Sequence, residues 1–553
     1  EFRARKRWIY LHGPFNATQV QPLRPLTGVH LEGSFQRFYP SRELARPIIG
    51  GLEPDRAAGG AGLELALDSI LTGRPGEAVL LKDRAGRRYD SPSRQVRDPV
   101  PGHDVVLTID AELQEIAERG LADALEEMKA EGGDVVFLDP KTGELLALAS
   151  RQVVPGAVPR ASTFTDPFEP GSTAKLFTAA ALIRYGVVDS TDTVFGERGS
   201  WAMPVNRSGR TRLIRDVHVH KGNLTLAEAI RTSSNIAMAK FSLRLRPEQQ
   251  YETLRDFGFG TPTGAEFPSE SRGQLAPPNR WQPMYTRASM AMGYELGVTP
   301  VQLAAAYGVI ANDGILLAPT LVREIRDPDG DVVYRHRPEP VRRVVSPAVA
   351  RQLRELLQGV VRRGTGSGAT IARFELAAKT GTARRVVHGK YATDEYTASF
   401  AALFPADAPQ VVVVVKIDDP DPRKKGYFSA QTAAPVTRAL IEQALASRTV
   451  TLNEARLAAA PAAAPAPLED EDGSVPYVVS WPYRPGTAAA RADRTVPDVT
   501  GRPLRDAVRA LHRRGFRVVL KGWGNAEHTW PAAGTSARAG SIVTLFAAPR
   551  SRP

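Results

Sequence analysis

An amphipathic helix is the clearest element that the pattern of apolar and polar residues predicts. It runs from Asp110 to about Lys129, and a strand is predicted just before it, at 104–109. The apolar residues recur at the spacing of one helical face. They are Leu113, Ile116, Ala117, Leu121 and Leu125. We therefore expect this helix to cover one side of a folded domain.

Several strands are predicted around this domain. Those at 134–139 and 144–149 are joined by PKTG, which is a good turn sequence. Much farther along, VVVVVKI at 411–417 is an unbroken, mostly β-branched run. Such a run is typical of a central strand that is covered on both faces. A further helical stretch follows Ser172.

The two ends of the chain differ from this middle part. Residues 1–104 are rich in Gly, Pro and Arg and hold few long periodic segments, so we expect a mostly β or extended module. Residues 449–494 are first Ala- and Pro-rich and then acidic, which predicts a linker. Residues 495–549 contain a turn, an amphipathic helix and strands, which predict a small α+β module. The main domain then spans 105–448.

Composition bounds the possible functions only broadly. With 553 residues the chain is too long for one core, and its 42% hydrophobic and 24% charged content is ordinary for a globular protein. The net charge of +12 favours anionic surroundings such as lipid head groups or an acidic polymer. No zinc-ligand spacing, arginine-rich tract or aromatic RNA-binding signature is present, so we do not expect a nucleic-acid partner.

Some chemistries are absent from the sequence. The chain has no cysteine, which excludes disulfides, thiolate metal sites and a cysteine nucleophile. His218 and His220 alternate along a strand-like stretch, but no third ligand lies nearby in the sequence, so we expect no metal site. No stretch approaches the roughly 18 apolar residues that span a bilayer. Because the chain begins at Glu1 within EFRARKRWIY, we expect a targeting or anchoring segment upstream.

The stretch EPGSTAKLF at 169–177 raises the question of chemistry. Ser172 and Lys175 are three positions apart at the start of an apolar helical run, so they share one face. A serine hydroxyl needs a base to become a nucleophile, and a lysine can serve if burial or neighbouring cations lower its pKa. By itself the pair is better explained by a serine that caps a helix and a lysine on the surface.

Two distant motifs change this interpretation. Ser233 and Asn235 stand in TSSN, and Lys379, Gly381 and their neighbouring threonines stand in KTGT within a strand-like context. Each motif alone is an ordinary loop or strand edge. Their occurrence in this order, with wide spacing, is hard to explain by chance.

The three motifs together resemble the S-x-x-K, S-x-N and K-T-G set of penicillin-binding proteins and serine β-lactamases. The flanking sequences are similar to monofunctional class B penicillin-binding proteins over residues from about 30 to 445; examples are RFYP, DPKTGELLALAS and GVTPVQLAAAYGVIANDG. The C-terminal module, with VPDVTGRPLRDAVRALHRRGF, resembles a PASTA domain. This combination is more similar to division or sporulation members than to elongation members.

The resemblance implies an α+β fold of the penicilloyl-serine transferase type, with an antiparallel sheet between helices and a mostly β N-terminal pedestal. It implies that Ser172 attacks a D-Ala-D-Ala stem peptide, that Lys175 is the general base, and that Ser233 and Asn235 relay the proton and hold the peptide. It assigns the substrate carboxylate to Lys379, Thr380 and Thr382 of KTGT, while Gly381 lets the substrate backbone approach closely. The backbone N–H groups of Ser172 and Thr382 would form the oxyanion hole.

The implied function is septal peptidoglycan cross-linking by an extracytoplasmic D,D-transpeptidase that β-lactams trap, with no metal or cofactor. A polytopic membrane glycosyltransferase and other division proteins are the implied partners, and the membrane is reached through the upstream segment. One alternative is a D,D-carboxypeptidase or β-lactamase-like hydrolase. Another is a non-catalytic scaffold or β-lactam sensor.

Overall fold

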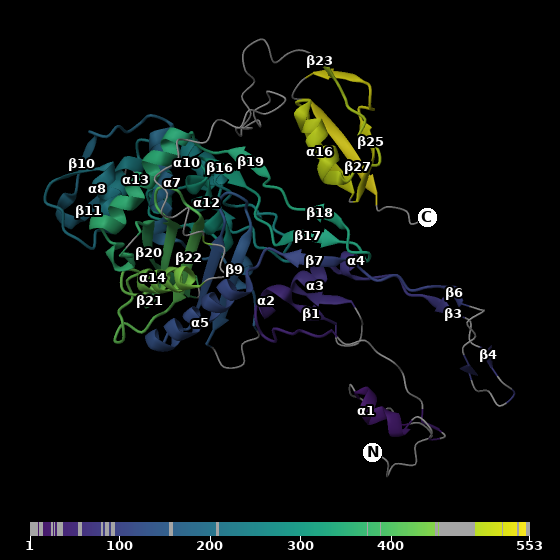
Figure 1. The fold of residues 1–553 in the computed structure, drawn as a ribbon. Coiled ribbons are helices and arrows are strands. Elements are labelled where there is room, and N and C mark those ends of the chain that lie inside the picture. The colour runs from purple at the N-terminus through teal and green to yellow at the C-terminus, as the bar shows by residue number, and fades with distance from the viewer. Residues whose placement is uncertain are drawn as a thin grey trace. The chain divides into compact units, whose positions relative to one another are not determined.

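The structure is a computed structural model of the chain, and Figure 1 shows its fold. It describes residues 37–447 and 493–548, with internal gaps at 54–57, 79–80, 83, 85–87, 90–94, 154–158, 206–208, 373, 388, 523 and 539–540; outside them it describes 9, 15–23, 26, 28, 29 and 452. The chain divides into two compact units, Glu1–Val478 and Val479–Pro553. Most of the expected linker, 449–494, lies outside the described residues.

A five-stranded antiparallel sheet forms the centre of the first unit (Figure 1). Its strands in spatial order are β20 (Ala377–Val387), β21 (Lys390–Phe404), β22 (Val411–Asp418), β8 (Gly132–Leu138) and β9 (Leu145–Gln152). The expected strands at 134–139, 144–149 and 411–417 are confirmed as β8, β9 and β22. The run of valines in β22 is in the middle because neighbours on both sides and helices on both faces bury it.

Helices cover both faces of this sheet. On one face α5 (Ala111–Met128) and α14 (Ala433–Ala446) pack against the odd-numbered residues of β22. On the other face α12 (Pro300–Ala311) packs against Val412 and Val414, in a core that also contains α7 (Lys175–Arg184). The expected helix at 110–129 is confirmed as α5, and its five predicted apolar residues are all buried.

The remaining helices and short strands build a helical lobe beside α7. Its helices are α8 (Leu226–Arg231), α9 (Asn235–Ser242), α10 (Pro247–Asp256), α11 (Pro283–Ala291) and α13 (Pro347–Arg363). The short helix α6 (Ser162–Thr165) packs instead on β8, β9 and α12. The short strands of the lobe are β10 (Thr193–Phe195), β11 (Ser200–Pro204), β12 (Thr211–Arg215), β13 (Asn223–Thr225), β14 (Gln274–Leu275), β15 (Leu296–Gly297), β16 (Ile315–Leu317) and β19 (Pro340–Arg343). This lobe supplies one wall of the site described below.

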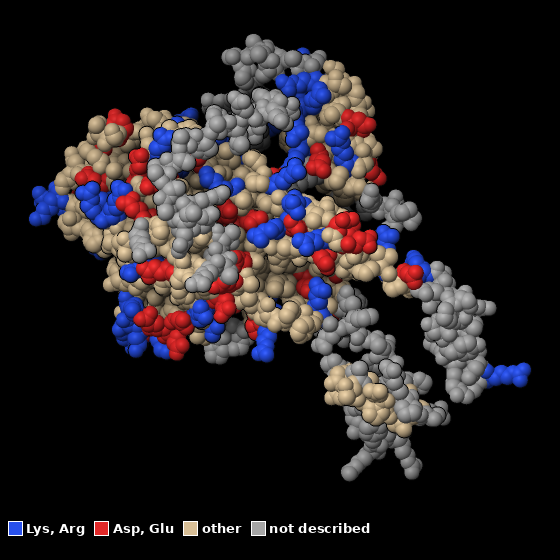
Figure 2. Space-filling model, viewed as in Figure 1, with Lys and Arg blue, Asp and Glu red and all other residues tan. Residues whose placement is uncertain are grey.

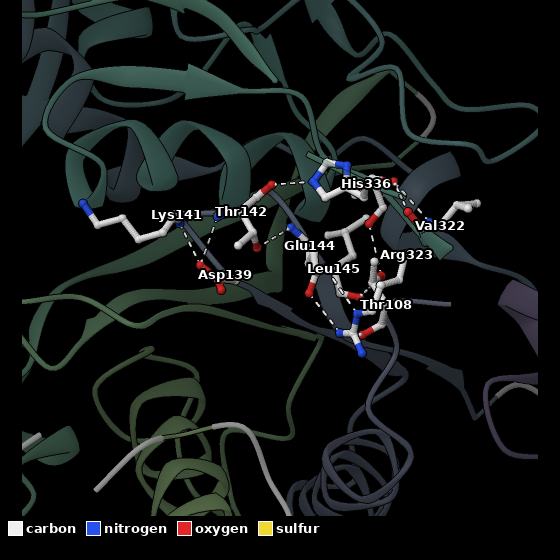
Figure 3. Close-up of polar contacts among 10 residues, drawn as sticks. Thr108, Asp139, Lys141, Thr142, Glu144, Leu145, Val322, Arg323 and His336 are labelled. Atoms are coloured by element: carbon white, nitrogen blue, oxygen red, sulfur yellow. Dashed lines mark hydrogen bonds and ion pairs between the residues drawn. The ribbon is translucent and has the colours of Figure 1, made fainter. Parts of the chain in front are cut away.

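A second, three-stranded sheet joins the turn between β8 and β9. It consists of β18 (Val332–Arg335), β17 (Val322–Arg326) and β7 (Asp104–Leu107) in that order. Figure 3 shows Arg323 reaching both the carboxylate of Glu144, at 2.9 Å, and the carbonyl of Thr108, at 3.2 Å. The Nε2 atom of His336 lies 2.8 Å from the carbonyl oxygen of Thr142, at hydrogen-bond distance. The polar contacts therefore fix this sheet against the β8–β9 turn.

The part before β7 is built of short elements, as expected for residues 1–104. Its helices are α1 (Ala17–Val20), α2 (Arg46–Ile49), α3 (Gly62–Ala66) and α4 (Asp68–Leu71). Its strand pairs are β1 (Gly51–Leu52) with β2 (Gly59–Ala61), β3 (Glu77–Ala78) with β6 (Gln95–Arg97), and β4 (Leu81–Lys82) with β5 (Arg88–Tyr89). We propose that the chain has three domains and one linker. The domains span 1–104, 105–448 and 495–549, and the linker spans 449–494.

The C-terminal unit has its own small core. Helix α16 (Leu504–Arg513) packs on a sheet of β24 (Arg517–Gly522), β27 (Ile542–Ala548) and β25 (Asn525–Trp530), and β23 (Asp493–Thr495) pairs with β26 (Ser536–Arg538). Val496, Leu511, Phe516 and Leu545 are among the residues of this core. The expected helix and strands are thus present, and the core needs no residue of the first unit.

Charged residues of both signs alternate over the visible face of the first unit (Figure 2). In the described part of the chain, every helix is too short or too polar to cross a membrane.

Candidate active site

Ser172 lies in a tight turn at the start of α7. The 3₁₀ turn η3 (Gly171–Ala174) precedes the helix, so the α-helical part begins at Lys175 rather than at Ser172 itself. Gly171 has φ +54°, a left-handed conformation that favours glycine, and a Cβ there would lie 3.1 Å from the carbonyl oxygen of Thr382. Ser172 is partly exposed, while the residues that follow it are buried. The turn thus presents one hydroxyl beside the KTGT strand.

Lys175 is completely buried, with 0% exposure, which rules out the interpretation of a surface lysine after a helix cap. Its Nζ donates hydrogen bonds to Asn235 Oδ1 at 2.8 Å and to Ser233, at 2.5 Å to the carbonyl and 3.2 Å to Oγ. Burial lowers the pKa of Lys175 to about 7, although the negative charge of Asp216 opposes this shift. Near neutral pH, a large fraction of Lys175 is therefore uncharged and able to accept a proton.

The TSSN motif lies at the start of α9. Ser233 adopts φ +60°, which is rare for a residue with a side chain. Its carbonyl accepts from Lys175, and its hydroxyl accepts from both Lys175 and Lys379. Ser234 caps α9 by accepting from the N–H of Ala237 at 3.0 Å. The unusual backbone conformation therefore occurs at the residue that contacts both lysines of the predicted site.

Asp216 holds this motif in place, and the sequence alone did not single it out. Its Oδ1 accepts from the N–H groups of Asn235 at 2.6 Å and Ile236 at 3.0 Å, and its Oδ2 accepts from Ser234 Oγ at 2.6 Å. The amide of Asn235 also donates to the carbonyl of Arg215 at 2.9 Å. A carboxylate at a helix N-terminus is favourable because unpaired N–H groups point toward it.

Lys379 completes the polar cluster from the sheet. It is 0% exposed, and its Nζ donates to Ser233 Oγ at 2.9 Å and to the carbonyl of Thr380 at 3.0 Å. Burial, followed by the nearby charge of Lys175, lowers the pKa of Lys379 well below its ordinary value. The hydroxyls of Thr365 and Thr380 form a hydrogen bond at 2.7 Å. Like Asp216, Thr365 contacts the site but stands in none of the three sequence motifs.

The rest of KTGT follows the edge strand β20 past the nucleophile turn. Gly381 is needed because a Cβ there would lie 2.6 Å from the carbonyl oxygen of Pro170 and 2.4 Å from Ser399 Oγ. Thr382 Oγ1 accepts from the N–H of Ser429 at 3.1 Å. β20 is an edge strand of the sheet, which is the position where a bound chain can pair with a strand's outward backbone groups.

The structure thus brings three distant motifs into one site. Hydrogen bonds connect Lys175, Ser233, Asn235, Lys379 and Thr380. Ser172 is close to this cluster because η3, which contains it, leads directly into Lys175. Its neighbour Gly171 lies against the backbone of Thr382. Within the described residues, the hydrogen bonds of Lys175 go to Ser233 and Asn235 and not to Ser172.

Three protein-family models match the chain. They are a penicillin-binding protein transpeptidase domain over residues 133–442, a penicillin-binding protein dimerisation domain over 16–107 and a PASTA domain over 494–548. The chain belongs to the class B penicillin-binding proteins. The predicted family and fold class are confirmed, and so is the serine-type transpeptidase class of enzyme.

Similar proteins of this family include several named peptidoglycan D,D-transpeptidases. The chain is 35% identical to a probable peptidoglycan D,D-transpeptidase PbpC from Pseudomonas aeruginosa, over 78% of this chain and 74% of the relative. It is 33% identical to the peptidoglycan D,D-transpeptidase FtsI of Escherichia coli K12, over 79% of this chain and 71% of the relative. Among solved structures, penicillin binding protein 3 from Mycobacterium tuberculosis with aztreonam matches with a TM-score of 0.64 and 30% identity, over 74% and 90% of the two chains.

Proposed function

We propose that this protein is a septal peptidoglycan D,D-transpeptidase that works through a Ser172 acyl-enzyme. The observation that carries the proposal is the fully buried Lys175, which lies one turn after Ser172 and is hydrogen-bonded to Ser233 and Asn235. A buried amine with a pKa of about 7 suits a general base near neutral pH.

In the acylation step, Ser172 Oγ attacks the carbonyl of the penultimate D-Ala while neutral Lys175 takes the hydroxyl proton. Lys175 exchanges one of its present hydrogen bonds for this contact, which apo geometry allows. The C–O bond forms, the bond to the terminal D-Ala nitrogen breaks, and the proton reaches that nitrogen through Ser233. An amine of a second stem peptide then attacks the ester and restores the Ser172 hydroxyl.

The neighbouring groups have binding roles in this proposal. Asn235 holds the peptide backbone of the donor. Lys379, Thr380 and Thr382 bind the carboxylate of the terminal D-Ala, and Gly381 lets the peptide approach β20. The N–H groups of Ser172 and Thr382 stabilise the oxyanion; loss of one such donor typically lowers the rate about 10²–10³-fold.

We further propose that the catalytic domain works outside the cytoplasmic membrane and that a β-lactam acylates Ser172. A polytopic membrane glycosyltransferase and other division proteins are the proposed partners, as the resemblance to class B penicillin-binding proteins implies. The transpeptidase class disfavours the two alternatives raised by the sequence, a D,D-carboxypeptidase or β-lactamase-like hydrolase and a non-catalytic scaffold or β-lactam sensor.

The test uses fluorescent penicillin and lipid-linked substrate. We expect covalent labelling of the intact chain at Ser172, no labelling of a folded Ser172→Ala variant, and formation of cross-linked dimer. Labelling of the alanine variant would overturn the site. Release of free D-Ala without cross-links would favour the hydrolase, and absence of labelling in the unmodified chain would favour the sensor or scaffold.

A further inference from the structure

A row of directly opposed residues crosses all five strands of the central sheet. In register order they are Ser150 on β9, Asp134 on β8, Lys416 on β22, Ser399 on β21 and Gly381 on β20. The row ends inside KTGT, and Val412 and Val414, on the same side of β22 as Lys416, pack into the core that contains α7. The polar row therefore lies beneath the segment that leads to Ser172.

The centre of the row is a buried ion pair. Asp134 is 1% and Lys416 is 5% exposed, and Lys416 Nζ lies 2.9 Å from Asp134 Oδ2. Lys416 also contacts the carboxylate of Asp418. The other oxygen of Asp134 accepts from Ser162 Oγ at 2.5 Å and from Ser150 Oγ at 2.9 Å. Burial by itself would lower the pKa of Lys416, but the two carboxylates raise it above its ordinary value, so the ammonium stays charged.

The segment before the nucleophile rests on this row at three points. Ser162 donates to Asp134, as described above, at the start of α6. The ring of Phe168 lies over the Lys416 ammonium, 5.6 Å from it to the ring centroid. The carbonyl of Pro170 accepts from Ser399 Oγ at 3.4 Å and passes close to Gly381. Ser172 follows Pro170 by two residues, so a displacement of this segment would also displace the proposed nucleophile.

Stability alone does not account for the pair. Burying two charges costs several kcal/mol each, and well-packed apolar residues of similar volume are often as stable or more so. An ion pair whose oxygens and ammonium are all partnered instead fixes directions, because each hydrogen bond has a preferred geometry. Here Asp134 fixes the position of Ser162, and Lys416 fixes the position of the Phe168 ring; both residues belong to the segment that precedes Ser172.

We propose that Asp134 and Lys416 are positioning residues that set the location of Ser172 through Ser162 and Phe168. This inference rests on the proposed role of Ser172 as the nucleophile. Neither residue touches the reacting atoms in this scheme. Their effect is on the acylation step, in which a displacement of about 1 Å can cost roughly a hundredfold in rate.

The main test is the double variant Asp134→Val with Lys416→Met, made in the full chain. We expect the double variant to fold with a somewhat lowered thermal midpoint, because apolar side chains replace the pair but the hydroxyls of Ser150 and Ser162 and the carboxylate of Asp418 lose a partner. We expect the rate constant of acylation by fluorescent penicillin to fall by about tenfold or more, with unchanged noncovalent affinity. A folded double variant that acylates at the unmodified rate would overturn the inference.

A single hydroxyl gives a second test if the double variant does not fold. Ser162→Ala removes only the donor to Asp134 at 2.5 Å. The matched control is Ser242→Ala, which removes an equally buried hydroxyl that bonds to the carbonyl of Ala239 within its own helix. We expect slower acylation in Ser162→Ala only, and equal rates in both variants would contradict the inference. If the unmodified chain takes no label, the proposed function itself fails.

Discussion

The carboxylate of Asp216 accepts a hydrogen bond from the backbone N–H of Asn235 at 2.6 Å. The loop after β12 thereby holds the start of α9, on which the S-x-N motif depends. The same carboxylate is the charge that raises the pKa of Lys175 against the effect of burial. One side chain thus affects both the position of Asn235 and the protonation of the proposed base.

We predict that Asp216→Asn slows acylation about tenfold or more, because the neutral amide weakens the charge-assisted hydrogen bonds from the N–H groups of Asn235 and Ile236 and its nitrogen cannot accept from Ser234 Oγ. The loss of the negative charge also lowers the pKa of Lys175 further, so the rise of acylation with pH should move to lower pH. Stopped-flow labelling across a pH series measures both effects. Asp189→Asn is the control, since Asp189 accepts similar bonds in an exposed turn away from the site. If both variants behave alike, Asp216 has no special role.

The pH dependence of acylation in the unmodified protein follows from Lys175. With a pKa of about 7, the lysine loses its proton as the pH rises through 7, and the neutral form is the one that can act as base. The acylation rate should therefore increase through this range and then level off. The measurement covers about two pH units on each side of the midpoint. A rate that keeps rising toward the ordinary pKa of a lysine would show that the pKa of Lys175 is not lowered, and a rate that stays flat through this range would show that Lys175 is not the base.

Gly293 supports the nucleophile turn from the opposite side. It has φ +84°, and a Cβ there would lie 1.9 Å from the carbonyl oxygen of Gly171. We predict that Gly293→Ala displaces η3, lowers the thermal midpoint and slows acylation by more than about tenfold. Gly209→Ala is a matched control, because Gly209 has φ +83° but open space around the position of a Cβ. Similar losses in both variants would point to backbone strain rather than to the turn.

The C-terminal unit should be dispensable for acylation. Every proposed site residue belongs to the first unit, and the core around Leu511 and Leu545 is separate. We predict that a chain lacking residues 479–553 takes up fluorescent penicillin at a rate within about twofold of the full chain. A larger loss of rate, with the thermal midpoint unchanged, would assign this unit a role in the site.

Much of the central fold was predictable because its signals are local. The apolar face of α5 and the valine run of β22 each follow from a periodicity that burial imposes on neighbouring residues. The start of α7 differed from the expectation, since η3 carries Ser172 and the α-helix begins at Lys175. The contact of Gly171 with Thr382, which favours this turn, joins residues more than 200 positions apart and leaves no local pattern.

The site residues divide in the same way. By itself the sequence determined which side chains can do chemistry, because Ser172, Lys175 and Lys379 stand in motifs with a definite order. Only the tertiary structure decided that Lys175 is buried, that Ser233 bridges the two lysines, and that Asp216 and the Asp134–Lys416 pair support them. The physical reason is that a pKa, a hydrogen bond and a buried charge depend on neighbours in space, which strand register and packing bring together from distant parts of the chain.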